Sequence, residues 1–120
     1  MKDEKDLTID NFDEPNFTTT HSFFIAGVQH HQLRSCLDEM NVGDRMILVL
    51  EPTNPYDPNA VRIEYSAHDS QVMCGYVPKK FSSEMSASLV IGNKLECVIV
   101  ELNPSAKPWE MCKVEIREGR

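Results

Sequence analysis

The stretch from residue 45 to residue 66 reads RMILVLEPTNPYDPNAVRIEYS and has three parts. Residues 45–51 form a strongly apolar run, and residues 60–66 alternate apolar and polar side chains, as a strand with one solvated face does. Between them, residues 52–58 hold three prolines. Proline fixes φ and removes a backbone donor, so this segment cannot be regular structure. The stretch therefore predicts two strands joined by a stiff loop.

Outward from this stretch, similar patterns predict further strands. Short β-rich segments bounded by turn residues recur along the chain. With the two above, the expected strands span residues 21–28, 45–51, 60–66, 72–77, 94–102 and 109–117.

Two segments have helical periodicity instead. Apolar residues at helical spacing predict a helix within residues 30–40, and a second helix is predicted over residues 78–92. The predicted fold is mainly β, a six-stranded OB-like barrel with two short α-helices. An α+β sandwich would give a similar order of elements.

The charge distribution divides the chain into a tail and a domain. The net charge is −7, and residues 1–20 carry six acids, two bases and few large apolar side chains. We expect residues 1–20 to be a flexible acidic tail and residues 21–118 to form one domain. A protein that grips nucleic acid by bulk charge is basic, so only a small site with locally clustered bases is compatible with this composition.

The chain shows no sign of membrane insertion or secretion. It has no apolar run near the ~20 residues of a membrane span, and its first residues are polar and acidic. We therefore expect a soluble cytoplasmic protein with no membrane partner.

The cysteines and histidines do not form a metal-binding pattern. Cys36, Cys74, Cys97 and Cys112 form no CxxC pair, and each lies among apolar neighbours. They are interpreted as reduced, buried thiols, although Cys97 and Cys112 could face each other on neighbouring strands. The pair at residues 30–31 has no third ligand at suitable spacing, so neither a metal nor another cofactor is expected.

No catalytic motif is present in the sequence. An acid–base set could be assembled from Glu51, His31 and Asp57. Carboxylates can be combined in this way in most proteins, so the set is not evidence of catalysis. A nucleophile elbow, a phosphate-binding loop and a metal signature are all missing. The sequence favours a binding protein over an enzyme.

Three blocks of the sequence resemble the HIRAN domain family. They are GVQHH at residues 27–31, LEPTNPYDPNAV at residues 50–61 and CGYVPK at residues 74–79. HIRAN domains occur in SNF2-type DNA translocases and as stand-alone microbial proteins. The resemblance implies a modified OB barrel that binds the 3′ end of single-stranded DNA, a link to DNA repair or replication, and a DNA-processing protein as a further partner.

The resemblance also implies roles for individual residues. Asp57 matches the aspartate that accepts a hydrogen bond from the 3′-hydroxyl, and its charge would repel a 3′-phosphate. Tyr56 and Trp109 match aromatic residues that stack on bases. Lys79 matches a basic residue that pairs with a backbone phosphate, and Lys80 extends it.

Three of the expected DNA-binding positions depart from the family pattern. Gln29 stands where the family has an arginine, so a charge-assisted phosphate contact becomes a neutral one. His30 is a smaller aromatic platform than the family residue, and Tyr76 replaces a histidine but can still stack or donate. We expect weaker DNA binding than in the translocase module.

Two alternatives remain open at this stage. The loop could be only a stiff connector, in which Asn54, Asp57 and Asn59 cap turns through backbone hydrogen bonds. The domain could also be a protein-interaction module without nucleic-acid binding, which the net charge of −7 suits better.

Overall fold

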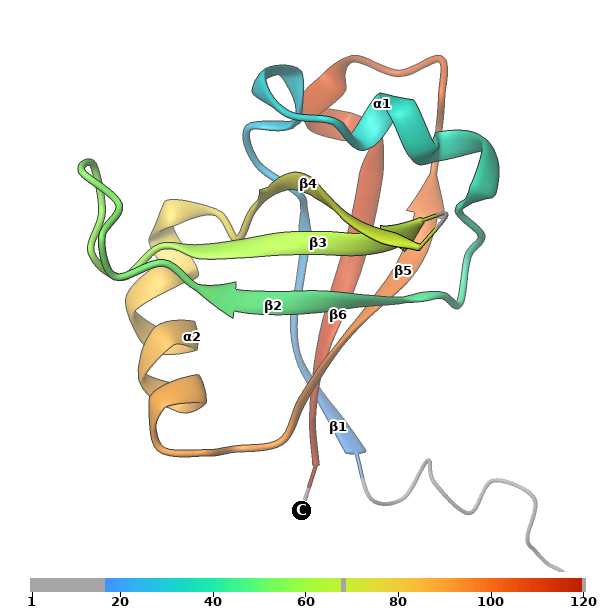
Figure 1. Ribbon diagram of the computed structural model, residues 1–120. Helices are drawn as coiled ribbons and strands as arrows, with labels where there is room; N and C mark the ends of the chain where they lie inside the picture. Colours follow the sequence, from blue (N-terminus) through green and yellow to red (C-terminus); the bar gives the residue numbers. More distant parts are fainter. Residues whose placement is uncertain (1–16, 68, 120) are drawn as a thin grey trace, which may run out of the picture.

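The computed structural model describes residues 17–67 and 69–119, and Figure 1 shows their arrangement. The strands in this part of the chain are β1 (Phe17–Phe24), β2 (Arg45–Leu50), β3 (Val61–Ala67), β4 (Ser70–Tyr76), β5 (Leu95–Leu102) and β6 (Cys112–Gly119). The helices are α1 (Leu33–Cys36) and α2 (Lys79–Val90), with 3₁₀ turns η2 (Val28–His30), η3 (Leu37–Glu39) and η4 (Pro108–Glu110).

The described strands form one antiparallel sheet in the order β1-β6-β5-β2-β3-β4. In Figure 1, β2, β3 and β4 cross in front of β1 and β6, so the sheet bends back over itself. β1 and β4 are the end strands of the sheet, and the described residues show one bridge between them: Ala26, just after β1, exchanges two backbone hydrogen bonds of 2.9 and 2.8 Å with Tyr76 of β4. The prediction of a mainly β, OB-like fold is confirmed, although the sheet is not a fully closed barrel.

The core lies inside the bent sheet. α1 packs on β4, and α2 packs on β3. Alternate residues of the strands point inward, as the two-residue period requires. The largest fully buried side chains include Ile25, Leu33, Ile63, Met85, Ile99 and Ile116.

All four cysteines are buried and free, as predicted. Burial raises the pKa of Cys36, Cys74, Cys97 and Cys112. A thiol that stays protonated is a poor nucleophile and a poor metal ligand. The cysteines therefore serve as small apolar residues of the core.

Helix α2 matches its prediction closely, and the helix expected within residues 30–40 is present but shorter and less regular. That segment forms one turn of α1 followed by η3. Its start is tied to the sheet, because Gln32 N–H donates to Met73 O of β4, and its end is closed by a 3₁₀ turn in which Met40 N–H donates to Leu37 O. The apolar stripe is still correct, since Leu33 and Cys36 are buried. Among the described residues, no helix is long and apolar enough to span a membrane.

The predicted boundaries of the first and last strands also shift. β1 ends at Phe24, so residues 25–28 of the predicted strand lie outside it and Val28 begins η2. β1 begins at Phe17, so residues 17–20 of the expected tail belong to the sheet, and residues 1–16 lie outside the described part of the chain. The last strand begins at Cys112, which leaves Trp109 in η4. The three residues 108–110 turn back on themselves, because Glu110 N–H donates to Lys107 O.

Gly75 allows the two end strands of the sheet to meet. A Cβ at this position would collide with Ala26 O and would lie 2.6 Å from Ile25 Cγ2. Only glycine tolerates so close a backbone approach. The bridge between Ala26 and Tyr76, and with it one wall of the site described below, depends on this missing side chain.

We expect Gly75→Ala to lower the free energy of unfolding by about 1–3 kcal/mol, because the added methyl group overpacks the contact. Urea denaturation measures the change. Ser83→Ala, at an exposed position of α2, is the control and should change stability by less than about 0.5 kcal/mol. An unchanged stability of the Gly75 variant would show that the strands can separate without cost.

Candidate functional site

A pocket of about 260 Å³ opens where four segments meet. These are the loop between β2 and β3, the end of β4, the start of α2 and the residues just after β1. Figure 1 shows the loop projecting from the sheet beside the first turn of α2. The lining residues are Ala26, Gly27, Asn54, Tyr56, Asp57, Ala60, Tyr76, Val77 and Lys79. The structure thus brings together Tyr56, Asp57, Tyr76 and Lys79 of the predicted site.

Asn54 shapes the loop. Its Oδ1 accepts hydrogen bonds from the backbone N–H groups of Tyr56 at 2.8 Å and Asp57 at 3.0 Å. An asparagine side chain that bonds the backbone two or three residues ahead replaces a regular turn. The prolines on either side restrict the chain further. As a result, Tyr56 projects into solvent with 88% of its surface exposed.

Asp57 is anchored from two elements. Its Oδ1 accepts the backbone N–H of Asn59 at 2.9 Å, and its Oδ2 accepts the Ser82 hydroxyl of α2 at 2.7 Å. The Ser82 hydrogen bond, followed by the Asn59 amide, holds the pKa of Asp57 below its ordinary value, and the charge of Lys79 adds to this. Asp57 is therefore ionised at neutral pH. A carboxylate offers about four acceptor positions, so lone pairs remain for a ligand.

The interpretation of the loop as a stiff, turn-capped connector is confirmed in part. Asn54 and Asp57 do cap turns through backbone N–H groups. The same bonds fix the side chains that line the pocket. The loop can therefore be a stiff connector and also form part of a binding site.

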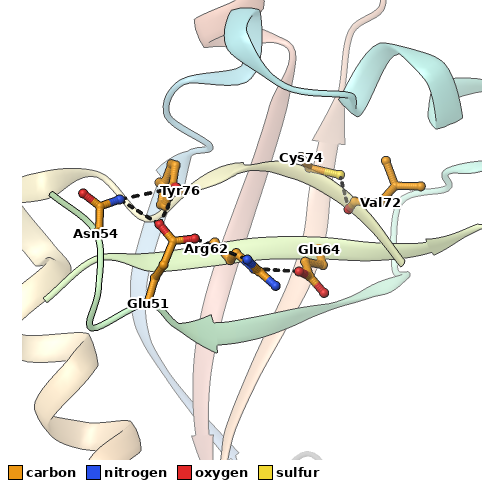
Figure 2. A network of polar contacts seen from close by, with 7 residues as sticks. All are labelled: Glu51, Asn54, Arg62, Glu64, Val72, Cys74 and Tyr76. Carbon is orange, nitrogen blue, oxygen red and sulfur yellow. Dashed lines mark hydrogen bonds and ion pairs between the residues drawn. The ribbon is translucent and has the colours of Figure 1, made fainter. Parts of the chain in front are cut away.

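Glu51 joins the loop to the sheet, as Figure 2 shows. Its Oε1 accepts from Tyr76 Oη at 2.6 Å and from Asn54 Nδ2 at 2.7 Å, and its Oε2 accepts from Arg62 at 3.3 Å. Arg62 Nε in turn lies 2.7 Å from Glu64 Oε2. One carboxylate thus holds both the tyrosine of the pocket wall and the asparagine that shapes the loop.

The ionisation of this network follows from its contacts. Burial raises the pKa of Glu51, but the hydrogen bonds from Tyr76, Asn54 and Arg62 outweigh it and leave the pKa lowered. Burial and the bond to Glu51 raise the pKa of Tyr76. Tyr76 therefore keeps its proton and donates a hydrogen bond to Glu51. The edge of its ring also meets the His31 ring, with the ring centroids 5.5 Å apart.

The other predicted residues lie outside the pocket lining. Gln29 and His30 are exposed in η2, which follows Gly27 of the lining directly. η2 packs against η4, where the Trp109 ring is 52% exposed. Together they form a second exposed surface beside the pocket, and their predicted roles stay predictions.

Lys80 is exposed next to Lys79, but its ammonium group lies 5.1 Å from the centroid of the Phe81 ring. A cation at this distance from an aromatic face is attracted to it. Its predicted phosphate contact also stays a prediction.

Three residues of the site were not predicted to belong to it, although the sequence indicated Asn54 as a turn cap. Asn54 lies inside the motif, and its spacing from Tyr56 and Asp57 is a signal for a side-chain turn. Glu51 was considered only as one of many carboxylates. Ser82 gave no local signal, because its partner Asp57 lies 25 residues earlier. Within the described ranges, no group of three or more His, Cys, Asp or Glu residues could hold a metal ion.

We expect Glu51→Gln to destabilise the fold in a pH-dependent way. The pKa of Glu51 is lower in the folded protein than its ordinary value of 4.5. Its charge therefore stabilises the fold above that pH, and this stabilisation is lost as the pH falls through the folded value. The substitution should cost about 1–3 kcal/mol at neutral pH, as expected for hydrogen bonds to a charged group, and less near about pH 3.

Urea denaturation at the two pH values measures the difference. Glu101→Gln removes an exposed carboxylate of β5 and is the control. An equal loss at both pH values would mean that the ionised form of Glu51 does not hold the network.

Comparison with known proteins agrees with the sequence resemblance. The family model described as HIRAN domain matches residues 19–116. No curated protein sequence gives a significant match. A crystal structure of a structural-genomics target protein from Lactobacillus plantarum superposes with a TM-score of 0.71 at 16% identity, covering 85% of this chain and 94% of that one.

The crystal structure of the HIRAN domain of human HLTF superposes with a TM-score of 0.64 at 14% identity, covering 89% of this chain and 83% of that one. At such identities, the two structures establish a shared fold. The family match spans most of the chain, so the protein belongs to the HIRAN domain family.

Proposed function

We propose that the pocket binds the terminal nucleoside at the 3′ end of single-stranded DNA, and that the protein does so without catalysis. The observation that carries this proposal is the ionised carboxylate of Asp57, fixed by two hydrogen bonds beside the exposed ring of Tyr56. Preorganised groups lose little freedom on binding, which is what a selective site requires.

The carboxylate suits a terminal hydroxyl. Ionised Asp57 can only accept hydrogen bonds, so it attracts a hydroxyl donor and repels a phosphate. Lys79 lines the same pocket and can pair with the phosphate that precedes the terminal sugar. An acceptor and a cation in one pocket match the two functional groups at a DNA 3′ end.

The aromatic groups suit a base. The Tyr56 ring is almost fully exposed, and the Tyr76 ring lines the pocket with its hydroxyl engaged by Glu51. Stacking on an aromatic face accepts any base and contributes about 1–3 kcal/mol per base. The pocket is slightly smaller than the roughly 300–1,000 Å³ of sites for drug-sized ligands, so it suits one nucleoside.

The surface formed by η2 and η4 extends the proposed site. Gln29, His30 and Trp109 would contact the nucleotides that precede the terminal one, and Lys80, next to Lys79 in the sequence, would contact a further phosphate. These contacts are few and carry little charge, in keeping with the net charge of −7. Free 3′ ends arise during DNA repair and replication, so a DNA-processing protein is the expected partner of such a module.

The net charge also favours a second candidate function, that of a protein-interaction module, and oligonucleotide titration distinguishes the two. Such a module would bind neither form of an oligonucleotide even at low salt, where phosphate contacts are strongest. It would instead form a stable complex with a protein partner.

We expect the protein to bind a short single-stranded oligonucleotide with a 3′-hydroxyl at least about tenfold more tightly than the same oligonucleotide with a 3′-phosphate, as charge repulsion at Asp57 requires. Asp57→Asn should remove most of this preference. Fluorescence anisotropy titration measures both affinities. Equal affinity of the unchanged protein for the two oligonucleotides would contradict the role given to Asp57.

We expect Lys79→Glu to weaken binding of the 3′-hydroxyl oligonucleotide at least about tenfold, because a charge-assisted phosphate contact is lost. Lys94→Glu is the matched control, since it makes the same charge change at an exposed position just before β5, outside the pocket lining. Similar losses in the two variants would show that only overall charge matters.

A further inference from the structure

Two polar or charged residues in the described part of the chain are buried, Glu64 and Ser82. Ser82 is the uncharged one, with 3% of its surface exposed. It lies in the first turn of α2, three residues after Lys79 of the pocket lining. Buried hydroxyl groups require hydrogen-bond partners. Ser82 Oγ has two acceptors in reach, Asp57 Oδ2 at 2.7 Å and Lys79 O at 2.9 Å.

A hydroxyl has one hydrogen, so Ser82 donates to one of these acceptors at a time. The bond to Asp57 is the shorter of the two, and its acceptor is charged. Hydrogen bonds to ionised groups are about twice as strong as neutral ones. The Ser82 hydrogen therefore belongs mainly to the Asp57 carboxylate.

This bond restricts the orientation of the carboxylate. Asn59 N–H holds Oδ1 from within the loop, while Ser82 holds Oδ2 from α2. Rotation of the carboxylate would break at least one of the two bonds. Without Ser82, Asp57 would keep only its bond within the loop and could turn toward the ammonium group of Lys79.

We propose that Ser82 is a specificity-determining residue of the pocket, which holds Asp57 so that its remaining lone pairs accept a terminal hydroxyl and its charge opposes a terminal phosphate. The inference rests on the proposed function and deepens it. Ser82 is a positioning residue, because it acts on the ligand through Asp57. The lowered pKa of Asp57, for which Ser82 is the largest cause, agrees with this role.

The test compares the affinities of the 3′-hydroxyl and 3′-phosphate oligonucleotides for Ser82→Ala and for the unchanged protein. The ratio of the two affinities should fall about tenfold, as expected for the loss of a hydrogen bond to a charged group. The pKa of Asp57, followed by NMR of its side-chain carboxyl carbon, should rise. Ser83→Ala, at the next and exposed position, should leave the ratio and the pKa unchanged.

Two further variants separate positioning from packing. Ser82→Cys fills the same space with a weak donor and should reduce the ratio as Ser82→Ala does, even if the alanine variant folds poorly. In the Asp57→Asn background, Ser82→Ala should have no further effect on the ratio, because interacting residues are not additive.

The outcomes distinguish the inference from the function. If the unchanged protein prefers the 3′-hydroxyl and the Ser82 variants keep that preference, the inference is overturned and the proposed function stands. An equal effect of Ser82→Ala with and without Asp57 would also overturn the inference. If the unchanged protein binds neither oligonucleotide, both are overturned.

Discussion

The Glu51 carboxylate is the contact on which the architecture of the pocket depends. It lies at the end of β2, where the chain leaves the sheet, and accepts hydrogen bonds from the sheet and from the loop at the same time. A loop of this length would otherwise be free to move relative to the strands. Because one ionised group holds both, the loop becomes part of the rigid sheet.

The second requirement is the close approach of the end strands of the sheet. The Tyr76 hydroxyl donates to Glu51, and the Tyr76 backbone forms the bridge with Ala26. The absence of a side chain at Gly75 makes that bridge sterically possible. The pocket is therefore built from segments far apart in sequence, each fixed by a different interaction. Asp57 adds the last link, since its bond to Ser82 connects the loop to α2.

Much of this arrangement could be predicted from the sequence. The strands around the loop and α2 follow from local periodicity, which tertiary contacts do not override here. Tyr56, Asp57, Tyr76 and Lys79 could be assigned to one site because two compact motifs carry them. The helix within residues 30–40 was predicted as too long and too regular, because the bond from Gln32 N–H to Met73 O of β4 keeps the residues before α1 out of the helix and the last turn is a 3₁₀ turn.

The residues that support the site could not be predicted in the same way. The contact of Glu51 with Tyr76 requires the register of β2, β3 and β4, in which Val49 faces Arg62 and Arg62 faces Tyr76. Side-chain period alone does not fix such a register. The contact of Ser82 with Asp57 depends on how the first turn of α2 packs beside the loop, and no local sequence pattern predicts that packing. Supporting residues of this kind become visible only when the fold is known.

The acidic composition of the protein is compatible with a DNA end as ligand for a specific physical reason. Most contacts to DNA are made to phosphates, and a net charge of −7 opposes them. A terminal hydroxyl carries no charge, unlike the phosphates, and it is a donor to which an ionised carboxylate is attractive. A protein that recognises this group needs one positioned acceptor, a stacking surface and one nearby cation. Under the proposed function, negative charge elsewhere on the surface would disfavour binding along the interior of a strand, so the composition that weakens overall affinity would favour selection of the end.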